Sequence, residues 1–297
     1  MQVRFVTCDV FTDTPFQGNP LAVIPDARGL STAQMQAIAR EFNYAESTFV
    51  LPPETPGGLA KVRIFTPVDE MPFAGHPTIG TALMLKAQEE VFGQKVGDAF
   101  VLEEKAGPVP VTISDGQATF TAPKPLTLGP PLPSAGIAAS LNLSAHDLSH
   151  NHPPQVAGVG LDFVFVELAS REALARARAD ATQLRALEDT WVGPGGSVAI
   201  YAYFKTESVV HARMFDPNGG IPEDPATGSA AAALAALLHK MQDLPSDGRF
   251  LVHQGEEMGR KSLLSLQVSG ESASMQVRVS GGAVKVMSGE LSLGGGR

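Results

Sequence analysis

Short runs of alternating apolar and polar residues dominate the chain, and turn-forming residues separate them. Alternation at every second residue is typical of a strand with one buried face, so these runs predict β-strands. In the first half, strands are expected at 3–10, 21–24, 47–51 and 61–65 and within 100–122. In the second half, strands are expected within 156–168, at 198–204 and 211–215, and within 250–293.

Helical patterns interrupt the strands at comparable places in each half. Ser31-Thr32-Ala33-Gln34 is a capping box, which predicts a helix that begins after Ser31. Further helices are expected at 78–88, within 170–187 and at 230–240. The helices at 78–88 and 230–240 carry few charged residues, so we expect sheet to cover them on all sides. The sequence therefore predicts an α+β protein in which antiparallel sheet surrounds a central helix, twice.

One segment of the sequence occurs twice. Arg63-Ile64-Phe65-Thr66-Pro67 recurs 150 residues later as Arg213-Met214-Phe215-Asp216-Pro217, and His76-Pro77 aligns with Asp224-Pro225 at an offset of 148. The copies then differ by one two-residue deletion, which an ancient duplication explains. Each copy consists of a strand, a loop with one ionisable residue, and a helix. If the halves pack about a pseudo-two-fold axis, the two loops converge.

The duplicated loops carry candidate chemistry. A proline in the first helical turn gives up only an N–H group that has no intrahelical partner, and the remaining N–H groups favour a bound anion. Asp, Ser and Thr are ordinary N-caps, so capping alone would explain Asp224. A cap needs no histidine, however, so His76 in the matching loop favours a functional site.

Composition limits the classes of partner and the number of domains. The chain has 297 residues, 43% hydrophobic and 18% charged, which suits a globular protein with two domains. A net charge of −9 without a basic run argues against nucleic acid and anionic membranes as partners. No stretch of about 18 apolar residues occurs, and 1–6 leads directly into a strand pattern. These features predict a cytoplasmic protein.

The repeat and a Pro-rich stretch at 123–133 together predict the domain boundaries. We expect an N-terminal lobe at 1–124, joined by the C-terminal strand at 283–297, and a C-terminal lobe at 125–282. The two lobes are expected to be pseudo-symmetric.

No motif for a metal or a nucleotide is present. The single cysteine, Cys8, rules out a multi-thiolate site, and its strand setting favours a buried structural thiol over a nucleophile. The seven histidines show no His-Glu-x-x-His spacing, and His150-Asn151-His152 lies in a Pro-rich linker. Glycine-rich runs at 193–197 and 218–220 lack the residues of a phosphate-binding loop. We therefore expect neither a metal nor a cofactor.

Four motifs in order resemble the phenazine-biosynthesis (PhzF-like) family over essentially the whole chain. They are Asp9-Val10-Phe11-Thr12 with Gly18-Asn19-Pro20-Leu21-Ala22-Val23, Asn43-Tyr44-Ala45-Glu46-Ser47-Thr48-Phe49-Val50, Phe73-Ala74-Gly75-His76-Pro77-Thr78-Ile79-Gly80, and Glu223-Asp224-Pro225-Ala226-Thr227-Gly228-Ser229-Ala230. The resemblance implies the diaminopimelate epimerase-like fold, with a cleft between two lobes. It also implies a cofactor-free homodimer.

The resemblance implies the site residues as well. In the member that names the family, an isomerase of a dihydro-hydroxyanthranilate, a Glu, a His, an Asp and a Ser surround the substrate. By motif, these residues correspond here to Glu46, His76, Asp224 and Ser229. We expect Glu46, His76 and Asp224 to be catalytic.

The residues themselves agree with this assignment, although each has a simpler explanation. Glu46 begins an apolar strand, where burial would raise the pKa of a carboxyl toward that of a useful acid–base; it could also be a solvated carboxylate. His76 and Asp224 would hold polar substituents of the substrate. Asn19 and the N–H groups near Gly75, Gly228 and Ser229 would bind its carboxylate. Alternatively, Ser229 is only a first-turn residue, and Asn19 only forms a turn before Pro20.

The predicted function is a cofactor-independent isomerase that moves a proton between carbons of a small unsaturated carboxylate. One alternative is an amino-acid racemase or epimerase, which on this fold uses two opposed thiols, but the chain has one cysteine. Another alternative is a small-molecule binding protein without catalysis. Four intact candidate site residues argue against a mere binder, because binding needs no desolvated acid.

Overall fold

The computed structural model describes residues 1–191, 199–207, 209–270 and 274–294. The chain divides into two compact units, Met1–Thr121 with Val279–Arg297, and Ala122–Arg278. Each unit combines strands with a buried central helix, so the chain is α+β. The glycine-rich run 193–197 lies outside the described residues, as does the first residue of the strand expected at 198–204.

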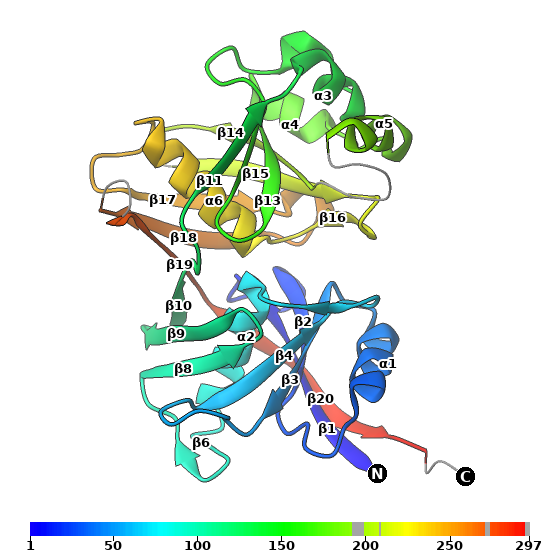
Figure 1. The fold of residues 1–297 in the computed structure, drawn as a ribbon, viewed down its shortest axis with the longest axis vertical. Coiled ribbons are helices and arrows are strands. Elements are labelled where there is room, and N and C mark those ends of the chain that lie inside the picture. Colours follow the sequence, from blue (N-terminus) through cyan, green and yellow to red (C-terminus); the bar gives the residue numbers. More distant parts are fainter. Residues whose placement is uncertain (192–198, 208, 271–273, 295–297) are drawn as a thin grey trace. The chain divides into compact units, whose positions relative to one another are not determined.

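The first unit is built around the N-terminal strand (Figure 1). Its helices are α1 (Thr32–Phe42) and α2 (Gly75–Lys86). Its strands are β1 (Gln2–Val10), β2 (Asn19–Ile24), β3 (Glu46–Leu51), β4 (Ala60–Phe65), β5 (Glu70–Met71), β6 (Glu90–Val91), β7 (Gln94–Lys95), β8 (Ala99–Glu104), β9 (Gly107–Ser114), β10 (Gln117–Thr121) and β20 (Ala283–Ser292).

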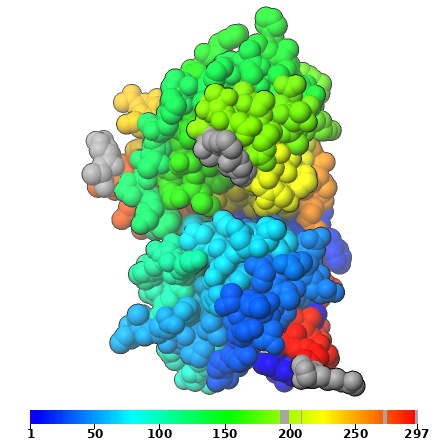
Figure 2. All heavy atoms as spheres, turned by 45° about the vertical axis from the view of Figure 1, so that its right-hand side comes forward, coloured from blue at the N-terminus to red at the C-terminus, as the bar shows by residue number. Residues whose placement is uncertain are grey.

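The pairing of β1 brings the two ends of the chain into one sheet. β1 pairs antiparallel with β2 on one side and with β20 on the other. Figure 2 accordingly shows red atoms of the C-terminal segment at the surface next to blue atoms of the N-terminal residues. The sequence predicted antiparallel sheet, but the sheet is mixed: β2 pairs parallel with β3, and β4 pairs parallel with β8.

Local sequence determines where α1 begins and ends. The Ser31 hydroxyl accepts a hydrogen bond from the Gln34 N–H, and the Gln34 side chain accepts one from the Ser31 N–H, at 2.9 Å. The predicted capping box is thus confirmed. Asn43 ends the helix with a left-handed backbone at φ 52°, which Asn tolerates better than most residues.

Helix α2 is enclosed by the first unit, as the small number of charges predicted. Every residue from Gly75 to Leu85 is buried, and the helix packs against β1, β2 and β10. Gly80 permits the close approach, because a Cβ there would come within 2.7 Å of Val10 Cγ2 and 2.6 Å of Leu21 Cδ2. Cys8 lies against the same point and is fully buried, which confirms the structural setting predicted for this thiol.

The second unit has a central helix, α6 (Gly228–Lys240), and three outer helices, α3 (Ser134–Ser140), α4 (Arg171–Arg176) and α5 (Ala181–Trp191). In Figure 1 these outer helices lie together beside β14. Short 3₁₀ turns are η1 (Ala145–Asp147) and η2 (Glu256–Met258). The strands are β11 (Thr127–Pro131), β12 (Gln155–Gly158), β13 (Asp162–Glu167), β14 (Ile200–Lys205), β15 (Val209–Asp216), β16 (Ile221–Asp224), β17 (Arg249–Gln254) and β18 (Ser262–Ser269), and β19 (Gln276–Gly281) contains the boundary between the units.

The expected helix within 170–187 is instead two helices. Ala177 leaves the helical conformation at ψ 134°, and the N–H groups of Arg178 and Asp180 donate to carbonyls of Leu141 and Ser140. Asp180 then accepts hydrogen bonds from the N–H groups of Thr182 and Gln183 at the start of α5. A tertiary contact and a local cap therefore override a continuous run of helix-forming residues.

The strands around α6 follow the plan of the first unit. β13 pairs parallel with β14, and β15 with β17, so this sheet is also mixed. Ala230 through Leu238 are buried in α6, which packs on β12, β13 and β18. The predicted enclosure of the second central helix is therefore confirmed.

The duplication is visible as one repeated side-chain arrangement. Arg63 makes a two-pronged ion pair with Glu70, with both N···O distances 2.8 Å, and its guanidinium lies 5.0 Å from the Phe65 ring centre. Arg213 does the same with Glu223, at 2.7 and 2.9 Å, and lies 4.8 Å from the ring centre of Phe215.

This arrangement corrects the alignment of the two copies. The arginines are 150 residues apart, but the glutamates and the first residues of α2 and α6 are 153 apart. The second copy therefore has three additional residues between the arginine and the ion-paired glutamate. Ser229, the second residue of α6, is the counterpart of His76, the second residue of α2; Asp224 is not, because it ends β16.

Candidate active site

The predicted site residues form two groups, one in each unit. Asn19, Glu46, Gly75 and His76 belong to the first unit, and Asp224, Gly228 and Ser229 belong to the second. Each group is described by itself.

In the first unit, three elements bring Asn19, Glu46 and His76 together. Asn19 begins β2 and Glu46 begins the parallel neighbour β3, while His76 lies in the first turn of α2. Asn19 Nδ2 is 3.3 Å from His76 Nδ1, and His76 Nε2 is 3.5 Å from Glu46 Oε2. The side chains of His76 and Glu46 are only 4% and 13% exposed, so Glu46 is not the solvated carboxylate of the simpler explanation.

His76 is a neutral imidazole in this setting. Burial lowers its pKa to about 3, so it carries no charge at physiological pH. The amide nitrogen of Asn19 can only donate, so Nδ1 of His76 accepts and the ring proton is on Nε2. That Nε2–H group lies on the side of Glu46. The distance of 3.5 Å is long for a hydrogen bond, and such contacts often tighten when substrate binds.

A second carboxyl, which the sequence analysis missed, lies at the start of α2. Thr78 Oγ1 is 2.7 Å from the Ala74 carbonyl oxygen and 2.6 Å from Glu104 Oε1. A hydroxyl has one proton to donate, so both contacts are hydrogen bonds only if the Glu104 carboxyl supplies the second proton. Burial raises the pKa of Glu104 to about 8, which agrees with a neutral acid. The sequence could have indicated Glu104, because it is an ionisable residue at a buried position of β8, two residues after the buried Leu102.

We expect Glu104 to make stability depend on pH. Its folded-state pKa of about 8 lies above the ordinary value of 4.5, so the folded state keeps a proton that the unfolded state releases. The free energy of unfolding should therefore fall as pH rises between these values. Glu104→Gln has no proton to release, so its stability should not fall in this way. At pH 8.5 the variant should therefore be several kcal/mol more stable than the wild type, because each pKa unit corresponds to about 1.4 kcal/mol.

Urea unfolding of the wild type and Glu104→Gln at pH 5 and pH 8.5 measures this effect. A stability difference between the two proteins that is the same at both pH values would show that Glu104 is not held neutral.

In the second unit, Asp224 belongs to a buried hydrogen-bond chain. Gln254 of β17 donates through Nε2 to the Asp224 carbonyl at 2.8 Å and to Thr227 Oγ1 at 2.9 Å. The Thr227 hydroxyl in turn donates to Asp224 Oδ2 at 2.5 Å. Gln254 Oε1 accepts from the Tyr201 hydroxyl and from the Thr227 N–H. The Thr227 hydroxyl accepts from Gln254 and donates to the Asp224 carboxylate, so Oδ2 of Asp224 is an acceptor in this chain.

Tyr201 and Gln254, which complete this hydrogen-bond chain, had no signal in the sequence. Tyr201, Thr227 and Gln254 meet through strand pairing and the turn before α6, and burial raises the pKa of Tyr201, which keeps its proton available to donate. Gly228 and Ser229 are the first two residues of α6, where helical N–H groups lack intrahelical partners. Thr227, not Asp224, occupies the N-cap position, so capping of α6 does not explain Asp224.

Comparison with known proteins agrees with this fold. A structure of a PhzF-family phenazine biosynthesis protein from Bacillus anthracis matches 99% of this chain and 100% of its own, with a TM-score of 0.86 at 24% identity. The chain thus has the same α+β fold as this PhzF-family structure. The family described as "Phenazine biosynthesis-like protein" (PhzC-PhzF) matches residues 8–289, and the chain belongs to this family.

Two curated relatives place the chain among isomerases. An uncharacterized isomerase of Mesorhizobium japonicum is 42% identical, covering 98% of this chain and 99% of the relative. The trans-2,3-dihydro-3-hydroxyanthranilate isomerase of Pseudomonas aeruginosa is 35% identical, again covering 98% and 99%. The chain is therefore an enzyme of the isomerase class. Among the residues that the structure describes, no helix has the length and apolar character needed to cross a membrane.

Proposed function

We propose that the enzyme moves a proton between two carbons of a small unsaturated carboxylate, with Glu46 as the acid–base. The observation that carries this proposal is a carboxyl only 13% exposed, with the neutral Nε2–H group of His76 at 3.5 Å. A partly desolvated carboxyl can both take and return a proton, and general acid–base catalysis needs that reversibility.

In the proposed reaction, the Glu46 carboxylate removes a proton from one substrate carbon. The electron pair of the broken C–H bond shifts along the unsaturated system, and the Glu46 carboxyl returns the proton to a second carbon. Substrate and product then have the same composition, so no oxidant or reductant is consumed. His76 Nε2–H can donate to the carboxylate form of Glu46 or to a polar substituent of the substrate, and Asn19 keeps the ring in that tautomer.

Asp224 has a positioning role in this proposal. Its carboxylate accepts from Thr227, within a chain that Gln254 and Tyr201 complete, which suits an acceptor that orients a donor group of the substrate. The N–H groups at the starts of α2 and α6, near Gly75, Gly228 and Ser229, would bind the substrate carboxylate.

The thiol-based racemase alternative finds no support in the geometry. Burial raises the pKa of Cys8 to about 12, so its thiol is not the thiolate that such chemistry needs. The isomerase relatives argue against the other alternative, a binding protein without catalysis.

Turnover should need neither an added metal ion nor the thiol. We expect EDTA treatment and, separately, Cys8→Ala to leave kcat within about twofold, because the proposed groups are a carboxyl, an imidazole and backbone N–H groups. Steady-state assays of folded protein measure this. Loss of turnover after either change, with the circular dichroism spectrum intact, would contradict the proposed chemistry.

The test of the proposed function is a metabolite screen in D₂O. Mass spectrometry should find a small carboxylic acid that gains deuterium only when the protein is present, and trans-2,3-dihydro-3-hydroxyanthranilate is the first compound to include. A ligand that binds without acquiring deuterium would favour the non-catalytic alternative.

A further inference from the structure

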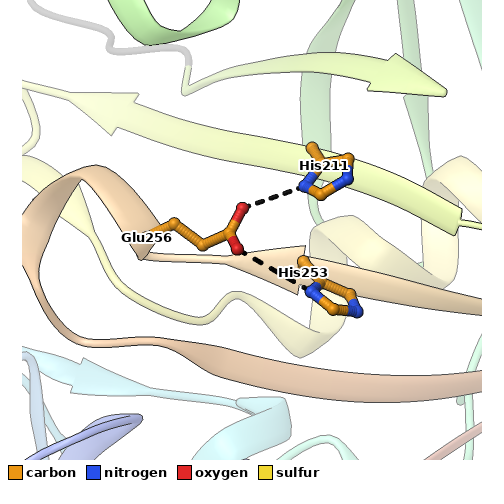
Figure 3. A group of neighbouring side chains, drawn as sticks. All are labelled: His211, His253 and Glu256. Atoms are coloured by element: carbon orange, nitrogen blue, oxygen red, sulfur yellow. Dashed lines mark hydrogen bonds and ion pairs between the residues drawn. The ribbon is translucent and has the colours of Figure 1, made fainter. Parts of the chain in front are cut away.

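Two histidines lie side by side on neighbouring strands of the second unit. His211 on β15 is the direct partner of His253 on the parallel strand β17, and their ring centres are 5.3 Å apart. In a parallel pair, partner residues project from the same face of the sheet, so both imidazoles reach the same region. Figure 3 shows the two rings next to each other with Glu256 beside them.

Glu256 places a carboxylate between the two rings. It follows β17 in the short turn η2, which directs its side chain back along the strand. Glu256 Oε2 is 2.9 Å from His211 Nδ1, and Glu256 Oε1 is 3.9 Å from His253 Nδ1. One ligand atom from each residue lies within 4.8 Å of the other two.

We infer that His211, His253 and Glu256 form a binding site for a divalent transition-metal ion of the Zn²⁺ type. Two imidazole nitrogens and one carboxylate oxygen are a ligand set that suits zinc with a fourth position left for water. Zinc bonds of about 2.0–2.1 Å at tetrahedral angles require ligand atoms roughly 3.3 Å apart. Side-chain rotations that move each ligand atom by about 1 Å or less would bring the three ligand atoms to that spacing.

Accessibility favours a metal that can enter and exchange. The three side chains are 25%, 25% and 24% exposed, so one side of the cluster faces solvent. A closed structural site would bury its ligands, whereas a three-ligand site with an exposed fourth position takes up metal directly from solution.

Arg171 competes with the metal for Glu256. Its Nη2 group donates to Glu256 Oε2 at 2.9 Å, and its Nη1 group donates to Glu257. A bound cation would take the place of Arg171 at Glu256, while Arg171 keeps its ion pair with Glu257. Removal of the guanidinium should therefore tighten metal binding, which a site formed by unrelated residues would not do.

The inferred site is separate from the residues proposed for catalysis. His211 is three residues before Met214, the strand partner of Asp224, and a strand rises about 3.3 Å per residue. The metal would thus lie roughly 10 Å along β15 from that pair. Its expected effect is on stability, because an ion that binds only the folded chain stabilises it. A metal site with this role is compatible with turnover that survives EDTA treatment.

No metal was expected from the sequence, so the inferred site departs from that expectation. The histidines show no His-Glu-x-x-His spacing, because His211 and His253 meet by strand pairing across 42 residues of sequence. Only His253 and Glu256, three residues apart, are close in the sequence.

The test is calorimetric titration of the chelator-treated, full-length protein with ZnSO₄. We expect one Zn²⁺ per chain, and we expect His211→Gln and His253→Gln each to weaken binding by at least about 100-fold, since even loss of an outer partner costs 10–100-fold. Arg171→Gln should tighten binding several-fold. MgCl₂ should not bind, because imidazole does not suit Mg²⁺.

The matched control is His150→Gln/His152→Gln, which removes two histidines of the segment between η1 and β12 and should leave the affinity unchanged. Co²⁺ absorption of the wild-type protein gives a readout that needs no variant: a four- or five-coordinate visible spectrum is expected. An absence of Zn²⁺ binding to the wild type would overturn the inference. So would binding that His150→Gln/His152→Gln abolishes and His211→Gln leaves intact.

Discussion

Replacement of Glu46 by Gln should reduce kcat by about 10² or more and leave substrate affinity within a few-fold. Glutamine keeps the shape of the side chain and an oxygen that can accept from His76 Nε2–H when that contact tightens. It cannot take a proton from carbon. The separation of kcat from binding is the signature of an acid–base group rather than a binding group.

The control for this variant is Glu54→Gln. Glu54 is a surface carboxylate, 68% exposed and paired with Lys61, so its replacement should leave kcat unchanged. Asp224→Asn should differ from both, with weaker binding as well as a lower rate, because the acceptor that ends the hydrogen-bond chain from Gln254 is altered. Normal turnover of Glu46→Gln would remove Glu46 from the mechanism.

Replacement of Arg213 by Met should cost about 3–5 kcal/mol of stability, the usual loss when one partner of a buried ion pair is removed. The Arg213 side chain is 2% exposed; it donates twice to Glu223 and also to carbonyls of Leu174 and Ala177. The variant would leave these acceptors without their donor and the Glu223 charge partly buried.

The duplicated partner provides the matched comparison. Arg63 makes the same ion pair with Glu70, but the two side chains are 19% and 21% exposed, so Arg63→Met should cost only about 1–2 kcal/mol. Urea unfolding of both variants measures the difference. Equal losses would show that burial does not distinguish the two copies of the motif.

Elements coded by local sequence were predictable. The capping box at Ser31 gave the start of α1, and the low charge of the two central helices gave their enclosure by sheet. The break between α4 and α5 was not predictable, because it depends on hydrogen bonds from Arg178 and Asp180 to a distant segment.

The candidate site was predictable to the extent that motifs mark it. Glu46 and His76 lie together, as required of two residues of one site, but the tautomer of His76 depends on Asn19, which comes from another strand. The alignment of His76 with Asp224 was wrong, because the two copies differ in the length of the loop before the glutamate. A dipeptide match could not reveal that insertion.

Contacts between a strand and the beginning of a central helix account for what the sequence missed. Glu104 meets Thr78 from β8, and Gln254 meets Thr227 from β17. Neither pair has a fixed spacing, so only the folded chain brings them together.

The most direct test of the central claim is the rate at which substrate hydrogen exchanges with D₂O, compared among the wild type, Glu46→Gln and His76→Ala. Exchange reports proton transfer to carbon itself and does not depend on product release. The account predicts that Glu46→Gln abolishes exchange while the folded variant still binds substrate. Exchange by Glu46→Gln at a rate near that of the wild type, with loss in His76→Ala, would assign the proton transfer to the imidazole and contradict the account.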